Sequence, residues 1–228
     1  GRGYFGAKVI IDATGDAQVC LRAGIPTVTG KNYMTYCVHG FSYDSAVKYG
    51  ADKDISKFRQ WINSGSNLFG EGHPEGLDLF SEYSAEKITE YLIYGKMATL
   101  ARYKSSDKNT REIMMLPTMP QYRTIRRIIG ERDFCAVDGE TYPDSIGDVG
   151  DFRPNGAGKR YQIPYAALYN GGFDNLLAAG RIISAPQGDG WEVARVIPCC
   201  ALTGEAAGKA AAIAARDGIA INKVLPMT

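Results

Sequence analysis

The sequence predicts a mixed fold of the α/β class, α+β overall, in which the two ends of the chain build one domain and the middle is an insertion. Residues 7–16 (AKVIIDATGD) resemble a buried strand that ends in a glycine turn. Residues 175–218 combine an apolar strand, a glycine-containing loop and an Ala-rich helix. Between them, aromatic and β-branched stretches alternate with helical patterns. We therefore predict one domain from residues 1–26 and 170–228, and a mixed α+β domain from residues 27–169.

The first half of the chain alternates between predicted strands and predicted helices. Residues 9–11 form a continuous apolar run, as expected of a strand buried on both faces of a parallel sheet. One or two helical turns over residues 16–24 stop at a glycine. Residues 27–44 are rich in tyrosine, threonine and valine, which favours a strand of a different sheet. Residues 52–63 carry apolar side chains at helical spacing.

The second half continues the pattern up to the final strand. Residues 81–104 hold the longest amphipathic helical pattern. Residues 122–131 (YRTIRRIIGE) predict a short helix that is closed by its glycine. Residues 161–168 (YQIPYAAL) favour an extended segment at a sheet edge, because proline cannot donate a ladder hydrogen bond. An apolar strand then runs over residues 176–179.

Composition excludes several classes of function. A net charge of +1 gives no electrostatic basis for binding nucleic acid or an anionic membrane. No apolar run approaches the roughly 18 residues of a membrane span. The five cysteines are odd in number and lack CxxC spacing, so we expect neither a disulfide framework nor a metal site. These features favour a reducing, cytoplasmic environment.

Each end of the chain places a glycine turn directly after an apolar strand. Thr14, Gly15 and Asp16 follow the first strand, and Gly180 and Arg181 follow the last. A strand that leads through such a loop to a helix N-terminus can hold an anionic ligand on backbone N–H groups. We interpret the turns as two halves of one nucleotide site. The alternatives are plain turns and, for Arg181, a surface arginine.

The start of the last helix is a further candidate for ligand binding. The residues concerned are Arg195, Val196, Ile197 and Pro198. Proline suits the first helical turn because its missing N–H would be unpaired there anyway. A helix N-terminus carries a partial charge of about +0.5. Gly204 and Gly208 would let the helix lie close to a sheet or a ligand, so Gly208→Leu is expected to disrupt folding. The alternative is an ordinary capped and packed helix.

Catalytic candidates come from the middle of the chain. On the predicted helix over residues 122–131, Arg123, Arg126 and Arg127 fall at positions i, i+3 and i+4 and share one surface. They could bind a carboxylate-bearing substrate, lie near a bound nucleotide cofactor, or form a solvated basic face paired with Glu131 or Asp133.

Other side chains have two interpretations as well. Tyr165 could present its phenol to a substrate, or pack in the core with its hydroxyl satisfied. Cys199 and Cys200 lie at a helix start, where a thiol pKa can fall, or serve as small apolar filler.

Four blocks, IDATGDA, YRTIRRIIGE, YQIPYAALYNGGFDNLLAAGRIISA and ARVIPCCALTGEAAGKAAA, closely resemble FAD-dependent oxidoreductases of the glutathione-reductase-like flavoprotein group. The resemblance implies a Rossmann-like FAD-binding domain interrupted by a substrate domain. It implies an enzyme that transfers a hydride between flavin and a small organic substrate. It also implies that the last helix points its N-terminus at the flavin pyrimidine edge. Relatives in the wider group commonly carry Asp or Glu where this chain has Arg181, which could instead reach a phosphate.

The chain departs from this family in two places. The lead Gly1–Gly6 (GRGYFG) precedes a strand instead of following one, so it is no GxGxxG cofactor motif. The resemblance therefore implies a C-terminal portion of a larger flavoprotein, inactive alone and holding FAD weakly or not at all, whose missing N-terminal part completes the site. The histidine that relatives often carry after GR-x-I-S-A is also absent, and Gln187 and Asp189 are the possible substitutes for it. A non-catalytic binding or assembly module with a degenerate flavoprotein fold remains the alternative.

Overall fold

The computed structural model describes residues 3–67, 69–80, 84–107, 111–123 and 126–224. The chain forms two compact units: unit 1 comprises residues 1–30 and 126–228, and unit 2 comprises residues 31–125. The boundaries differ from those predicted, because residues 126–169 belong with the chain ends and not with the insertion. Their strands pair with or pack against elements of unit 1. Helices and strands are mixed in both units, as the α/β class predicts.

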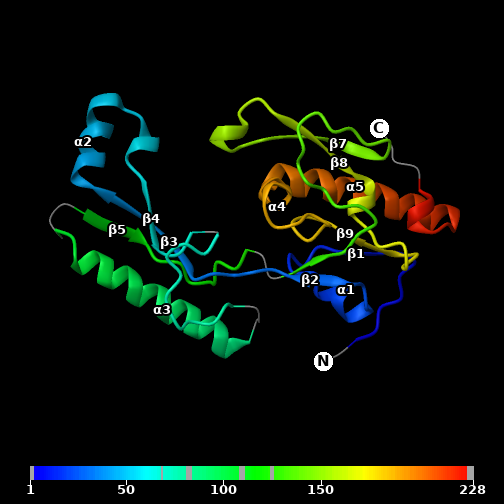
Figure 1. Ribbon diagram of the computed structural model, residues 1–228, viewed down its shortest axis with the longest axis horizontal. Helices are drawn as coiled ribbons and strands as arrows, with labels where there is room; N and C mark the ends of the chain where they lie inside the picture. The colour runs from blue at the N-terminus through cyan, green and yellow to red at the C-terminus, as the bar shows by residue number, and fades with distance from the viewer. Residues whose placement is uncertain (1–2, 68, 81–83, 108–110, 124–125, 225–228) are drawn as a thin grey trace. The chain divides into compact units, whose positions relative to one another are not determined.

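Unit 1 contains three two-stranded sheets, three α-helices and three short 3-10 helices among its described residues. Its elements are β1 (Ile10–Asp12), α1 (Gln18–Ala23), β2 (Thr27–Thr29), β6 (Arg126–Ile128), β7 (Ser145–Gly150), β8 (Arg160–Pro164), β9 (Leu176–Ala178), α4 (Asp189–Ala194) and α5 (Ile197–Asp217). Strands β1 and β9 run side by side in parallel, whereas β2–β6 and β7–β8 are antiparallel pairs (Figure 1). The β7–β8 hairpin lies along α5 (Figure 1).

Strand β9 is the centre of unit 1. All three of its residues are buried, and successive side chains point to opposite faces. Leu177 packs in the cluster that contains the buried side of α5. Leu176 and Ala178 pack in a second cluster, with α1 and β6. The strand is therefore covered on both faces, as the apolar run over residues 176–179 predicts.

Strand β1 differs from its prediction. Ile10 and Ile11 are 41% and 36% exposed, so the expectation of a strand buried on both faces is wrong for the described residues. The reason is its position at an edge: within the described part of the chain, β9 is the one strand that pairs with β1. Asp12, at its end, is fully buried.

Helix α5 packs through its small residues. Its buried positions are Cys199, Thr203, Ala207, Ala210 and Ala214. Gly204 and Gly208 lie on the exposed side, and a Cβ built on either would meet nothing within 4 Å. The predicted close approach at these glycines is therefore wrong for unit 1, and with it the expected disruption by Gly208→Leu. Alanines and Thr203 make the contact with the sheet instead.

The segment predicted as a helix over residues 122–131 is extended where the structure describes it. Strand β6 pairs with β2, with Val28 opposite Arg127. The N–H of Ile128 also donates to the carbonyl of Ile182 at 3.0 Å, and the N–H of Ile129 to that of Pro26 at 2.8 Å. Residues 124 and 125 lie outside the described residues. These non-local hydrogen bonds outweigh the local helical pattern, so the helix prediction is wrong.

Unit 2 is an antiparallel sheet with a long helix packed on it. Its elements are β3 (Thr35–Ser42), α2 (Tyr43–Asp52), β4 (Gln60–Gly65), α3 (Ala85–Lys104) and β5 (Arg111–Met115), with the strands in the order β4–β3–β5. Helix α3 contacts β3 and β4 over a core that includes Tyr36, Phe80 and Tyr91. The helix predicted over residues 81–104 is confirmed from residue 85 onward, residues 81–83 lying outside the described part.

Two further predictions, for residues 27–44 and 52–63, differ from the structure. The strand predicted over residues 27–44 divides into β2 and β3. The helix predicted over residues 52–63 is wrong, because α2 ends at Asp52 and β4 begins at Gln60. Over the described ranges of the whole chain, no helix combines the length and apolarity needed to cross a bilayer.

Alanine substitutions at two helical glycines are expected to change the free energy of unfolding in opposite directions. A Cβ on Gly95 in α3 would come within 2.2 Å of the Tyr36 ring. We expect Gly95→Ala to lower the free energy of unfolding by about 1–3 kcal/mol, because overpacking forces core side chains out of their rotamers. Gly208→Ala in α5 should raise it by up to about 1 kcal/mol, since alanine is the better helix former. Urea unfolding followed by circular dichroism measures both. A similar loss in the two variants would contradict the open position of Gly208.

Candidate functional site

The two glycine turns lie at one edge of the β1–β9 sheet. Parallel pairing sets Asp12 beside Ala178, so the carboxyl ends of both strands meet there (Figure 1). The N–H of Ala179 donates to the carbonyl of Asp12 at 2.9 Å. The turns that follow, residues 14–16 and 180–181, are thereby brought together. In open α/β sheets this edge is where ligands bind.

Asp12 holds the first turn in shape. One carboxylate oxygen accepts hydrogen bonds from the Thr14 N–H at 2.9 Å and from its hydroxyl at 2.7 Å. The other accepts from the Cys20 N–H at 2.8 Å. Burial raises the pKa of Asp12, but the hydrogen bonds from Thr14 and Cys20 outweigh burial and leave that pKa below its usual value. The Thr14 hydroxyl also accepts from the Gln18 N–H at 3.1 Å. Thr14 therefore shapes the turn.

The second turn is tied to the first turns of α5. The N–H of Gly180 donates to the Thr203 hydroxyl at 3.0 Å, and that hydroxyl donates to the Cys199 carbonyl at 2.9 Å. Gly180 has a φ of +81°, a conformation that favours glycine. A Cβ there would lie 3.7 Å from the sulfur of Cys200. The N-terminal part of α5 thus packs directly against the glycine turn.

The N-terminus of α5 is open. Val196 makes no side-chain capping hydrogen bond, and Pro198 occupies the first turn as predicted. Ile197 is 85% exposed. The first N–H groups of this helix, with their partial positive charge, therefore have no side-chain cap.

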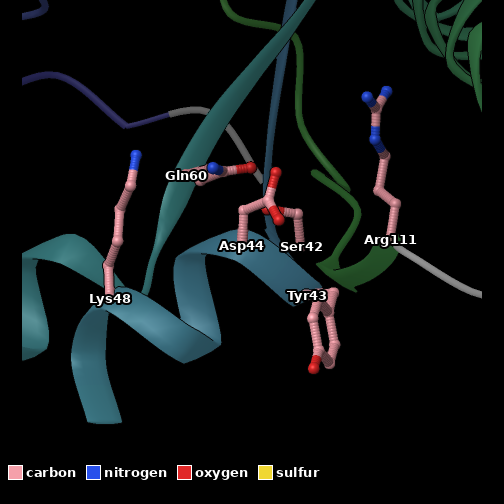
Figure 2. A pocket seen from close by; sticks show the side chains of 6 residues that line it. All are labelled: Ser42, Tyr43, Asp44, Lys48, Gln60 and Arg111. Carbon is pink, nitrogen blue, oxygen red and sulfur yellow. The ribbon is translucent and has the colours of Figure 1, made fainter. Parts of the chain in front are cut away.

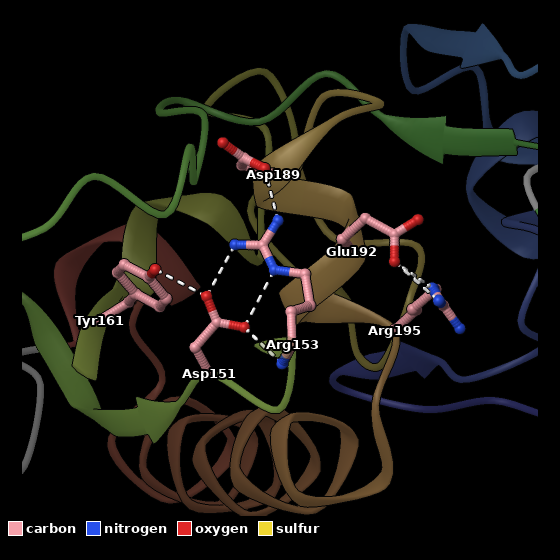
Figure 3. Close-up of polar contacts among 6 residues, drawn as sticks. All are labelled: Asp151, Arg153, Tyr161, Asp189, Glu192 and Arg195. Carbon is pink, nitrogen blue, oxygen red and sulfur yellow. Dashed lines mark hydrogen bonds and ion pairs between the residues drawn. The ribbon is translucent and has the colours of Figure 1, made fainter. Parts of the chain in front are cut away.

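Arg195, which precedes this helix, is already engaged. Its guanidinium donates to the Glu192 carboxylate at 2.7 Å and lies 4.9 Å from the centre of the Trp191 ring (Figure 3). The charge of Arg195 is therefore balanced within the protein.

Two other arginines reach the first turn. The Nε of Arg181 donates to the Gly15 carbonyl at 2.6 Å, and the Nη1 of Arg126 donates to the Asp16 carbonyl at 3.4 Å. Gly15 has a φ of +79°, and a Cβ on it would lie 3.4 Å from the Arg181 guanidinium. The structure thus places Arg126 with the predicted cofactor residues. The sequence pattern grouped Arg126 with the catalytic candidates, because it assigned Arg126 to a helix that does not form.

The predicted catalytic group is not assembled as expected. Arg123 belongs to unit 2, where its N–H donates to the Asn32 side chain at 2.9 Å, whereas Arg126 belongs to unit 1. Arg127 pairs with Asp133 at 3.3 Å, which confirms the alternative of a paired basic residue. With no helix over residues 122–131, the three arginines share no helix surface, and that prediction is corrected.

The remaining catalytic candidate, Tyr165, fits the packing alternative. Its side chain is buried, and its hydroxyl donates to the Ile221 carbonyl at 3.0 Å. A phenol that is enclosed and already hydrogen-bonded has no surface to offer a substrate. We assign Tyr165 to the core of unit 1.

The cysteines at the start of α5 act as core residues. Cys199 is fully buried, and burial raises the pKa of its thiol to about 12. Burial also raises the pKa of Cys200, although the nearby Arg181 opposes that rise. Both thiol pKa values therefore shift in the direction opposite to the fall that a helix N-terminus can cause. The filler interpretation therefore fits these residues.

A polar cluster in unit 1 surrounds Arg153 (Figure 3). Its guanidinium donates to both oxygens of Asp151, at 2.9 and 2.8 Å, and to Asp189. The Tyr161 hydroxyl donates to Asp151 at 2.8 Å. These side chains line a cavity of about 410 Å³. The side-chain hydrogen bonds of Arg153 hold the pKa of Asp151 well below its usual range. Asp189 is thereby committed to an ion pair that joins α4 to the segment after β7.

Unit 2 has a polar hollow of its own (Figure 2). It is lined by Ser42, Tyr43, Asp44, Lys48, Gln60 and Arg111. Asp44 and Gln60 extend toward the same space, whereas Tyr43 points away from Gln60 (Figure 2). None of the residues predicted for the site lies here, and we assign it no ligand.

Comparison with known proteins identifies one relationship. The model of the family described as FAD dependent oxidoreductase matches residues 79–227, more than half of the chain. The matched region includes β6, β9 and α5, and so Arg126, Gly180 and Arg181. Searches of curated proteins and of solved structures gave no match.

Because the pKa of Asp12 is lowered in the folded protein, we expect the free energy of unfolding to depend on pH. A carboxyl whose pKa is lower in the folded state stabilises the fold above its unfolded value, near 4, and this stabilisation is lost as pH falls through the folded pKa. We expect Asp12→Asn to cost about 1–3 kcal/mol at pH 7, and less below pH 4. Urea unfolding from pH 7 to pH 3 measures the difference, with the exposed Asp148→Asn as control. Equal pH dependence in Asp12→Asn and the parent would contradict this role.

Proposed function

Because the chain belongs to the family of FAD-dependent oxidoreductases, we propose that unit 1 supplies part of the FAD site of an enzyme that transfers a hydride between flavin and a small organic substrate. The observation that carries the proposal is the parallel pairing of β1 with β9. It joins two turns that are far apart in the sequence at the ligand-binding edge of a sheet. A plain pair of structural turns would not require an uncapped helix N-terminus, nor two arginines that have no carboxylate partner among the described residues.

The residues present fit the chemistry of FAD. Gly15 and Gly180 both have positive φ and carry no side chain, so the backbone is accessible at each turn. Arg126 and Arg181 add positive charge next to Gly15. The open N-terminus of α5 adds more. FAD carries a pyrophosphate, and its isoalloxazine ring gathers negative charge on reduction, so both parts suit a positive surface.

FAD, when bound, supplies the hydride-accepting and hydride-donating chemistry, and the protein supplies position and electrostatics. In this proposal the N-terminus of α5, formed by residues 196–198, stabilises negative charge on the ring without reorganising. Asp12 and Thr203 fix the turns, since their side chains accept hydrogen bonds from backbone N–H groups. Gly204 remains an open position on the exposed side of α5, with room beside it for a ligand.

We further propose that another segment of the same protein covers the outer edge of β1. Ile10 and Ile11 are apolar and exposed there, whereas strands of parallel sheets are normally covered on both faces. A strand and helix carrying the GxGxxG turn that the family resemblance implies would cover these isoleucines and complete the cofactor site. In this proposal, unit 2 is the substrate domain.

Flavin binding tests the proposal. The protein expressed from its full natural reading frame is expected to purify yellow and to bleach with dithionite. Gly15→Ala should weaken FAD binding by about tenfold or more, because a side chain at a φ of +79° strains the turn by about 1–3 kcal/mol. Gly208→Ala, on the open side of α5, is the matched control and should bind FAD as the parent does. A parent protein that is colourless and does not bind added FAD would favour the alternative of a non-catalytic binding or assembly module.

A further inference from the structure

We propose that Arg126 and Arg181 together form an anion site that binds the pyrophosphate of FAD. The inference deepens the proposed function and rests on it, because it names the part of the cofactor that this turn recognises. It also moves Arg126 from the catalytic role predicted from the sequence to a cofactor-binding role.

A comparison of arginines leads to this pair. Five arginines among the described residues of unit 1 are half-buried: Arg126, Arg127, Arg153, Arg181 and Arg195. Three of them pair with a carboxylate: Arg127 with Asp133, Arg153 with Asp151, and Arg195 with Glu192. Over the described ranges, Arg126 and Arg181 form no such ion pair. Buried charges are normally balanced, and the carbonyl groups that these two arginines contact are neutral, so the pair is suited to an added anionic ligand.

The two guanidinium groups converge on one turn. They donate to consecutive carbonyl oxygens, Arg181 to Gly15 and Arg126 to Asp16. Each group uses one N–H in this way, and a guanidinium has five. The acid of this turn, Asp16, forms no ion pair with either guanidinium over the described ranges, and its carboxylate accepts from the Gln18 side chain at 3.0 Å. Both arginines are therefore anchored by the turn and keep donors for a ligand.

Charge matching favours a diphosphate over a single carboxylate. Two guanidinium groups carry two positive charges and offer planar pairs of donors, which suit phosphate oxygens. A pyrophosphate diester carries two negative charges and balances both arginines, whereas a monocarboxylate would leave one unbalanced. Gly15 contributes by lacking a Cβ, because a side chain there would press on the Arg181 guanidinium at 3.4 Å.

Isothermal titration of the purified chain with inorganic pyrophosphate tests the site without redox activity. We expect Arg126→Gln and Arg181→Gln each to weaken pyrophosphate binding by about tenfold or more, since hydrogen bonds between charged groups are the strong ones. Arg22→Gln removes the same charge from the exposed side of α1 and should bind as the parent does. Arg126→Lys and Arg181→Lys keep the charge and should fall between parent and Gln variant. The Lys variants also test the site if a Gln variant fails to fold.

A second titration separates the possible sources of the anion. FAD binding should weaken in both Gln variants, whereas binding of riboflavin, which has no phosphate, should not change. Malonate serves as the dicarboxylate probe. Malonate binding that is tighter than pyrophosphate binding, with unchanged FAD affinity, would assign the arginines to a substrate and overturn the inference. A parent that does not bind pyrophosphate, or Gln variants that bind it equally well, would also overturn it.

The outcomes distinguish this inference from the proposed function. Gln variants that bind FAD as tightly as the parent and still bleach with dithionite would refute the anion site and leave the function standing. Arginine-dependent binding of pyrophosphate in a protein that rejects FAD would support the anion site and refute the function.

Discussion

The parallel pairing of β1 with β9 is the contact on which the rest of the structure depends. It places the end of the first strand beside the end of the last one, so that Arg181 reaches the Gly15 carbonyl across 166 residues of sequence. Neither turn alone has the geometry of a ligand site. Together they share one sheet edge, with α5 packed against the second turn through Thr203. The candidate site is therefore a product of topology and not of any single motif.

The hydrogen bonds inside the two turns determine what remains for a ligand. The Asp12 carboxylate, the Thr14 hydroxyl and the Thr203 hydroxyl are all used within the protein. Burial raises the pKa of Cys200, so its thiol stays protonated. The donors left over are those of the two arginines and the N-terminus of α5, which carry positive charge, while the Asp16 carboxylate in the same turn accepts from the Gln18 side chain. A site built from these parts suits an anionic ligand, in keeping with a flavin nucleotide.

Local patterns predict part of this structure well. The strand over residues 176–179, the short helix before Gly24 and the long helix of unit 2 follow directly from apolar spacing and glycine stops. Non-local effects account for the errors. Residues 126–128 have helical spacing but gain hydrogen bonds from β2, and the abundance of alanine around α5 conceals which side packs. The sequence pattern selected both turns that meet at this sheet edge, but for the same reason it grouped Arg126 with the catalytic candidates.

An amide chemical-shift titration of the isotopically labelled chain with FAD tests the central claim most directly. If the paired strand ends line one flavin site, the signals of Thr14, Gly15 and Gly180 shift together and fit one dissociation constant, while Gly208 stays unchanged. Shifts confined to one strand end, or different dissociation constants at the two ends, would contradict a shared site.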